Sequence, residues 1–95
     1  MSLVLRVSVQ VVELASRLAP EPRRTVKRAL QYLRKERGEI RSLEGALAGY
    51  HRLRVGRFRI AFSYAADGAI EAVFVEERTL VYAVFEADLI RRLKS

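Results

Sequence analysis

Apolar and polar residues alternate along both halves of the stretch 50–64, and the two halves meet at Gly56. Alternation with a period of two predicts half-buried strands, and a glycine between two such runs predicts a β-hairpin. We assign Gly56 and Arg57 to a two-residue type II′ turn, because that turn favours glycine at its first central position. This register places Arg54 opposite Arg59. The apolar face then comprises Leu53, Val55, Phe58, Ile60, Phe62 and Tyr64, and the opposite face comprises Arg52, Arg54, Arg57 and Arg59.

The N-terminal part of the chain has the periodicity of a strand followed by two helices. Residues 3–7 predict a short strand, and Ser8 stands where a helix N-cap is expected. The first helix ends before Pro20, which disfavours helical geometry in the preceding residue. The second helix is predicted over about 21–37, with Gly38 just past its end. The apolar stripe of the first helix comprises Val11, Leu14, Ala15 and Leu18, and that of the second comprises Val26, Ala29, Leu30 and Leu33.

A third strand is predicted over 70–77, after a turn at Asp67 and Gly68. Simple alternation places Ile70, Ala72 and Phe74 on one face of this strand, and Val73 and Val75 on the other. Apolar residues on both faces indicate a central position in the sheet.

The remaining segments complete an α+β domain. Residues 39–49 show no clear period, 78–85 are predicted to be extended, and 86–94 are predicted to form a short helix. The order β, α, α, β, β, β and a terminal helix predicts a single domain over 1–95. We expect an antiparallel sheet with the helical hairpin packed on one face, and the arginine face at least partly open.

The net charge and the residue composition restrict the classes of function that we expect for this protein. The 95 residues carry a formal net charge of +7 and a sequence pI near 10.6, which favours anionic partners. Cysteine is absent and there is one histidine, so we expect no disulfide, metal site or cofactor. We expect no signal peptide or membrane segment, and a cytoplasmic location. The basic residues of the second helix are interpreted as a solvated face: Arg23, Arg24, Lys27, Arg28, Arg34, Lys35 and Arg37.

Three strings together resemble the RelE/ParE toxin superfamily over about residues 3–85. They are Leu43-Glu44-Gly45, the stretch 50–64 with its Arg-Val-Gly-x-x-Arg-Ile core, and Glu77-Arg78 followed by Val81-Tyr82. RelE-type members are ribosome-dependent endoribonucleases that cut mRNA, whereas ParE-type members poison DNA gyrase. Both are neutralised by an antitoxin. The resemblance favours a RelE-type mRNA interferase that inhibits translation, with a gyrase inhibitor as the alternative.

The resemblance also implies the site residues. Arg59, Arg78, Tyr82 and Arg54 are expected in the catalytic site, and Arg52, Arg54 and Arg57 in RNA binding. Guanidinium groups suit the charge that builds up on a phosphoryl group when a ribose 2′-OH attacks it. Tyr82 is suited to stack on a base, although an aromatic residue in an extended segment is equally often part of a core. His51 lies on the face away from the arginines and is interpreted as structural.

The sequence departs from the family pattern at Glu76 and Glu77, where a basic residue or histidine commonly precedes the arginine matched by Arg78. These carboxylates either weaken a phosphate pocket or transfer a proton. A catalytically silent member that only binds a partner or nucleic acid therefore remains an alternative. The expected partners are mRNA, the ribosome and an antitoxin with an acidic, partly amphipathic segment, which would cover or displace the terminal helix around Leu89, Ile90 and Leu93. DNA gyrase is the alternative partner.

Overall fold

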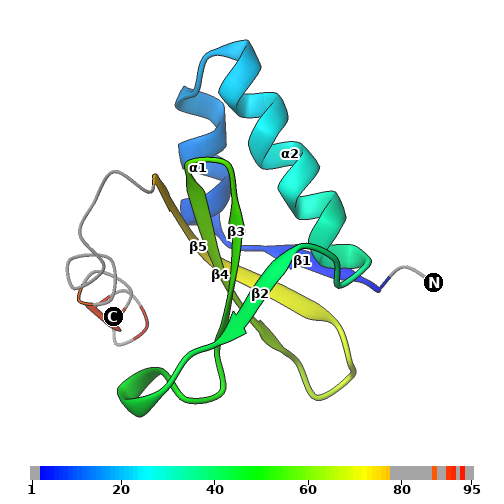
Figure 1. Ribbon diagram of the computed structural model, residues 1–95, viewed down its shortest axis with the longest axis vertical. Coiled ribbons are helices and arrows are strands. Elements are labelled where there is room, and N and C mark those ends of the chain that lie inside the picture. The colour runs from blue at the N-terminus through cyan, green and yellow to red at the C-terminus, as the bar shows by residue number, and fades with distance from the viewer. Residues whose placement is uncertain (1–2, 78–86, 88–89, 92, 94–95) are drawn as a thin grey trace.

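The computed structural model describes residues 3–77, 87, 90–91 and 93. Helices α1 and α2 lie next to each other and cover one face of a five-stranded sheet (Figure 1). The predicted α+β architecture with a helical hairpin on one face is therefore confirmed. Its elements are β1 (Leu5–Val7), α1 (Val9–Arg17), α2 (Pro20–Arg34), β2 (Glu39–Ser42), the 3-10 turn η1 (Gly45–Leu47), β3 (His51–Val55), β4 (Phe58–Tyr64) and β5 (Ile70–Glu77).

The strand order is β1-β5-β4-β3-β2, and the sheet is antiparallel except at one edge. There β1 pairs in parallel with β5, and the chain between these two strands passes through α1, α2 and the three antiparallel strands β2, β3 and β4. The expectation of a wholly antiparallel sheet is corrected at this edge. Strand β2 is an addition to the predicted order, because only Ile40 of its four residues turns toward the core.

The central hairpin has the predicted register. Val55 pairs with Phe58, and Arg54 pairs with Arg59. Gly56 has φ +56°, whereas Arg57 is not among the described residues with positive φ. This combination fits a type II′ turn and excludes type I′, which needs positive φ at both central residues. Five of the six predicted apolar positions pack against the helices, and Tyr64 lies at the exposed end of that face.

The helix boundaries follow from local hydrogen bonds. The Ser8 hydroxyl accepts a bond from the Val11 N–H at 3.4 Å, as an N-cap does. Helix α2 ends at Arg34, three residues before the predicted end. Glu36, at φ 51°, adopts the left-handed conformation that terminates the helix, so the stop comes before Gly38. The Arg23 guanidinium donates to the Leu18 carbonyl at 2.9 Å and so ties α2 to the end of α1.

A β-bulge in β5 divides the core into two clusters. Ala61 pairs with Phe74, while the next residue, Phe62, pairs with Ala72, so Val73 is the extra residue. Beyond the bulge the faces are exchanged, and Phe74 lies on the side away from the helices. The predicted grouping of Phe74 with Ile70 and Ala72 is therefore wrong.

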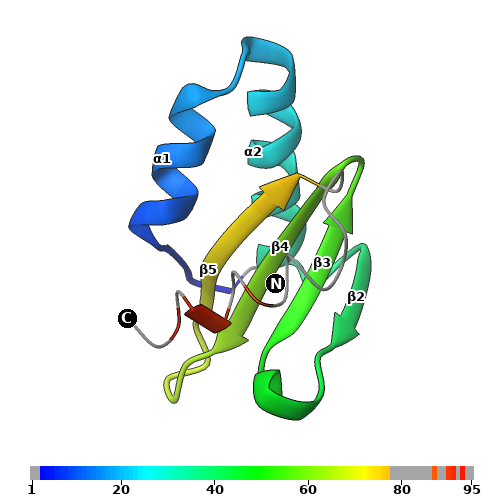
Figure 2. The ribbon, with the colours of Figure 1, turned by 90° about the vertical axis from the view of Figure 1, so that its left-hand side faces the viewer.

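The main cluster lies between the sheet and the helices, and the second lies on the opposite face. Ile90 and Leu93, both helical, pack against the second cluster (Figure 2). The main cluster contains Val11, Val26, Ala29, Leu33, Leu53, Phe58, Ile60, Phe62, Ile70, Ala72 and Val75, and the second contains Leu43, Leu47, Ala61 and Phe74.

Side chains from the start of α1 form hydrogen bonds with the β5 backbone beyond the point where β1 stops pairing with β5. The Ser8 hydroxyl donates to the Val73 carbonyl at 2.9 Å. The Gln10 amide bonds both backbone groups of Val75, at 3.0 and 2.9 Å. These contacts satisfy polar groups that a longer edge strand would otherwise bind, and they hold the bulge in place.

Candidate functional site

Four charged residues form a row across the sheet. Glu39 of β2 pairs with Arg54 of β3, Arg54 pairs with Arg59 of β4, and Arg59 pairs with Glu76 of β5. Directly opposite residues point to the same side of a sheet, and Arg59 shares its side with Ala61 of the second cluster. The row therefore lies on the face away from the helices. Its two central arginines are flanked by a carboxylate on each side.

Arg59 is a buried side chain, with 5% of its surface exposed. A buried guanidinium requires nearby negative charge, and the strand register places Glu76 directly opposite. We expected this face to be at least partly open, and at Arg59 that expectation is wrong. Leu43, Leu47 and Phe74 form an apolar cluster on the same face, which removes this part of the sheet from solvent.

Arg52 and Arg54 lie on the same face, nearer its edge. The Arg52 side chain is 11% exposed, and its Nη2 lies 4.0 Å from Glu39 Oε1. Arg54 is half-buried, and within residues 3–77 no acidic side chain lies within 4.0 Å of it. A hollow of about 340 Å³ adjoins Arg52 and provides space for a ligand beside the row. It is lined by Arg41, Ser42, Leu43, Glu44 and Arg52.

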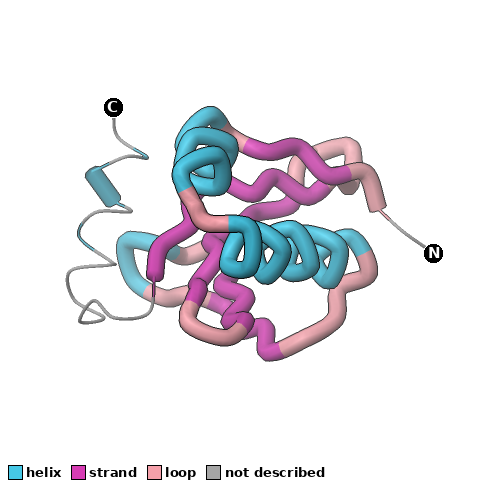
Figure 3. Tube along the Cα trace, turned by 90° about the horizontal axis from the view of Figure 1, so that it is seen from above, coloured by secondary structure: helices cyan, strands magenta, loops and turns pink. Residues whose placement is uncertain are grey.

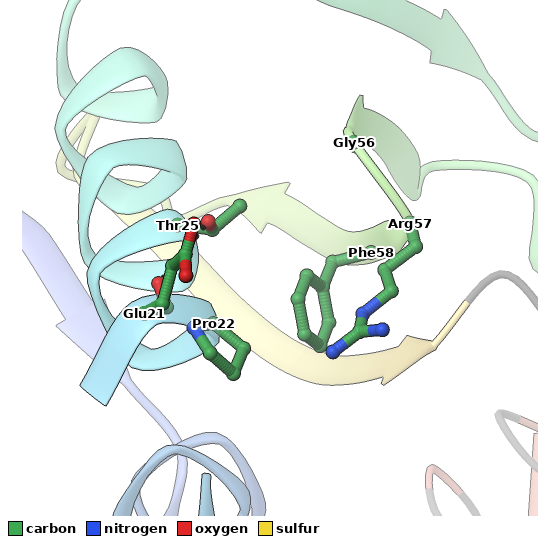
Figure 4. A pocket seen from close by; sticks show the side chains of 6 residues that line it. All are labelled: Glu21, Pro22, Thr25, Gly56, Arg57 and Phe58. Atoms are coloured by element: carbon green, nitrogen blue, oxygen red, sulfur yellow. Dashed lines mark hydrogen bonds between the residues drawn. The ribbon is translucent and has the colours of Figure 1, made fainter. Parts of the chain in front are cut away.

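Arg57 does not join the other arginines, so its predicted place on the arginine face is wrong. Its guanidinium carbon lies 5.7 Å from the centre of the Phe58 ring, a cation–π distance. Together with Phe58 it lines a separate pocket of about 360 Å³ against the first turns of α2 (Figure 4). A residue in a turn is not held to the alternation of the flanking strands, and the Phe58 ring provides a favourable contact on the helix side.

The remaining predicted site residues, Arg78 and Tyr82, lie outside the described residues. Glu76 and Glu77, which precede Arg78 in the sequence, lie on opposite faces of the sheet. Glu76 faces Arg59, whereas Glu77 pairs with Phe58 and so points to the helix side. The sequence analysis expected Glu76 and Glu77 beside a phosphate pocket but did not place Glu76 opposite Arg59, because Glu76 lies beyond the bulge. It missed Glu39, which lay in a segment without a clear period.

His51 lies on the helix side of the sheet, as predicted, and has structural contacts. Its ring centre lies 5.4 Å from that of Phe62 and 5.3 Å from that of Tyr64. Its Nδ1 lies 3.2 Å from Ser42 Oγ. The Tyr64 hydroxyl donates to a Glu36 carboxylate oxygen at 2.7 Å. Burial, followed by this hydrogen bond, raises the pKa of Tyr64 to about 12.

The turn between β4 and β5 is fixed by Asp67. Its carboxylate accepts a hydrogen bond from the Ala69 N–H at 3.0 Å and forms an ion pair with Arg6 of β1. The backbone hydrogen bond, followed by the one from Arg6, lowers the pKa of Asp67. These contacts hold the edge strand to the turn, at the opposite end of β4 and β5 from the arginine row.

The part of the chain that the structure describes contains neither a metal-ligand cluster nor a membrane-spanning helix. No three histidine, cysteine or acidic side chains there are grouped so as to hold a metal ion. None of the helices described is long and apolar enough to cross a membrane.

Comparison with known proteins places the fold. No family model matches the sequence, and no curated protein matches it. A chain of the RelBE2 toxin–antitoxin complex from Mycobacterium tuberculosis superposes with a TM-score of 0.66 and 19% identity, covering 82% of this chain and 100% of that chain. A chain of the archaeal RelE–RelB complex from Pyrococcus horikoshii superposes with a TM-score of 0.62 and 23% identity, covering 85% and 100%. The protein therefore shares its fold with these chains from two toxin–antitoxin complexes.

Proposed function

We propose that this protein is the toxin of a type II toxin–antitoxin system and that it cleaves mRNA on the ribosome. The observation that carries the proposal is the pairing of Arg54 with Arg59 at the centre of the charged row. Like charges directly opposite each other destabilise a sheet, and a bound phosphate would offset that repulsion. Likeness to chains from two toxin–antitoxin complexes supports the toxin role.

The arginines would act on the charge of the transition state. In the proposed reaction a ribose 2′-oxygen gives up its proton and bonds to the adjacent phosphorus. The bond to the 5′-oxygen breaks, and that oxygen takes up a proton. Negative charge accumulates on the phosphoryl oxygens meanwhile, and preorganised donors stabilise it. Arg54 and Arg59 would supply the positive charge that stabilises the phosphoryl oxygens, and Arg52 would hold a neighbouring phosphate. Arg78 and Tyr82 retain their proposed roles in stabilising charge and stacking on a base.

A second candidate function rests on Glu76. A carboxylate directly opposite Arg59 competes with a phosphate for that guanidinium. A protein in which Glu76 keeps Arg59 occupied would bind its partner, or RNA, without cutting. Replacing Glu76 with glutamine removes that competition, so a gain of cleavage in Glu76→Gln would favour this second candidate.

The proposed protein partner is an antitoxin with an acidic, partly amphipathic segment. The net charge of +7 favours such a segment. The second apolar cluster, against which Ile90 and Leu93 pack, offers an adjoining apolar surface. The antitoxin segment would compete with these two residues for the cluster and cover the arginine row.

The test is induction of the chain in cells, followed by growth measurement and mapping of mRNA ends. Arg54→Ala should reduce cleavage about 10²- to 10³-fold, the usual effect of losing one such donor. Arg59→Lys should also reduce cleavage, because an ammonium group cannot reproduce the bidentate fork. The control is Arg17→Ala, at an exposed position on α1 away from the row. Circular dichroism of each variant separates lost chemistry from lost folding.

Three outcomes are distinguishable. New mRNA ends that disappear in Arg54→Ala but persist in Arg17→Ala support the endoribonuclease. Growth arrest with intact mRNA and a DNA-damage response supports a gyrase inhibitor. If induction does not slow growth, and if Arg54→Ala and Arg59→Lys behave like the parent protein, the toxin proposal fails.

A further inference from the structure

Helix α2 and its C-cap residue, Lys35, carry a stripe of basic side chains on the outer side of the helix. Arg24, Lys27, Arg28 and Lys35 are all exposed, and we call these four residues the α2 stripe. At 3.6 residues per turn they fall within about 100° of arc. Val26, Ala29 and Leu33, each 0% exposed, occupy the opposite side of the helix and pack on the sheet. In the view from above, no other element lies over α2 (Figure 3).

Most of the protein's surplus of positive charge lies on residues 20–37, which include α2. Residues 20–37 contain seven basic and two acidic side chains, a surplus of five against +7 for the whole chain. Within residues 3–77, no member of the α2 stripe has an acidic partner within 4.0 Å. The neighbouring Arg23 and Arg34 differ, because each donates to a backbone carbonyl and so has a structural role.

The arrangement is unfavourable for the isolated helix. Like charges three or four residues apart repel each other, as Arg24 does with Lys27 and Arg28. Acidic residues at alternating positions would remove this repulsion, yet none occurs between 22 and 35. A helix face that is simply solvated gains nothing from such a pattern, whereas a face that binds a polyanion does.

We propose that the α2 stripe binds the phosphate backbone of RNA. The stripe spans 11 residue steps, about 16 Å at the α-helical rise, which matches several consecutive phosphates. It lies on the other side of the sheet from the arginine row, so the RNA bound here is a second segment, separate from the strand presented to Arg54 and Arg59. The choice of RNA rests on the proposed function, and the binding itself requires no cleavage.

Because backbone contacts read charge, the test compares two variants of equal net charge. Arg24→Gln/Arg28→Gln removes two positive charges from the stripe. The matched control, Arg17→Gln/Arg37→Gln, removes two exposed charges outside it. The full-length chain, made by cell-free synthesis, is titrated into a fluorescent RNA of about 20 nucleotides at several salt concentrations between about 50 and 200 mM. The RNA carries 2′-O-methyl groups, so it cannot be cut.

The stripe variant should bind more weakly, and to the same extent for RNAs of different base composition. The slope of log affinity against log salt concentration should be smaller in magnitude by about 1.4, because each phosphate contact on a single strand contributes about 0.7 to that slope. The control variant should change by less than half as much. Circular dichroism should show unchanged helix content in both variants.

Equal loss in the two variants would mean that net charge alone matters, and it would overturn the inference. So would a stripe variant that binds RNA normally but loses affinity for a polyglutamate peptide, because the stripe would then be a surface for acidic proteins. Failure of mRNA cleavage in cells together with the expected loss of RNA binding would reject the proposed enzyme and leave this inference standing.

Discussion

Gly38 has the least space for a side chain of the five glycines, and replacing it with alanine should destabilise the fold by contact with one identifiable atom. Its φ is +105°, and a Cβ there would lie 2.7 Å from Leu53 Cδ1. Leu53 is fully buried in the main cluster, so it has little room to move. Gly38→Ala therefore combines backbone strain of about 1–3 kcal/mol with overpacking of about 1–3 kcal/mol.

Gly49 provides a control for the backbone term alone. It has φ +96°, close to that of Gly38, and a Cβ there meets no atom within 4 Å. Gly49→Ala should cost about 1–3 kcal/mol, and both substitutions gain the same small amount from a less flexible unfolded chain. In urea unfolding followed by circular dichroism, Gly38→Ala should lose roughly 1–3 kcal/mol more than Gly49→Ala.

The decisive measurement is a double-mutant cycle with Leu53→Val, which removes the δ carbons. In that background the penalty of Gly38→Ala should fall to about that of Gly49→Ala, a coupling of about 1–3 kcal/mol. If Gly38→Ala costs the same in both backgrounds, the steric account is refuted and the backbone conformation alone explains the loss.

Three further outcomes concern single charged or polar groups. Because the pKa of Tyr64 is raised in the folded state, its contribution to stability is present below about pH 10 and is lost as the pH rises toward about 12. In Tyr64→Phe, urea titrations at alkaline pH should show a smaller loss of stability. A pH profile identical to that of the parent protein would contradict this prediction. The lowered pKa of Asp67 means that its contribution is present above about pH 4 and lost as the pH falls through the folded-state pKa, so Asp67→Asn should weaken the fold at neutral pH but not in strong acid. Arg28→Glu replaces a repulsion with Arg24 by an attraction and should stabilise α2 by about 0.4–1 kcal/mol at low salt; a gain that persists in about 1 M salt would exclude charge as its cause.

The hairpin was predictable because one glycine and strict alternation fix a unique register, including the contact of Arg54 with Arg59. The N-cap at Ser8 was predictable for the same reason, since its signal is local. Strand β2 was not, because an edge strand with a single inward residue, Ile40, has no readable period.

Only the two arginines of the charged row could be predicted from the sequence. Its two arginines come from the hairpin, but its carboxylates depend on long-range pairing. Simple alternation along β5 would place Glu76 on the helix side with Ala72, and only the extra residue at Val73 reverses that orientation. Apolar residues on both faces of a strand conceal such an insertion. The burial of Arg59 depends on packing from a distant part of the chain, which local patterns do not report.

The bulge at Val73 also determines which face of the sheet each later residue of β5 occupies. Residues before it contribute to the core under the helices, and from Phe74 onward the strand serves both that core and the charged row. Regular alternation through Val73 would turn Glu76 toward the helices, whereas deletion of Val73 would remove the bulge and keep Glu76 opposite Arg59. The orientation of Glu76 at the candidate site therefore depends on Val73 staying outside the pairing with β4, and the hydrogen bonds of Ser8 and Gln10 to Val73 and Val75 stabilise that arrangement.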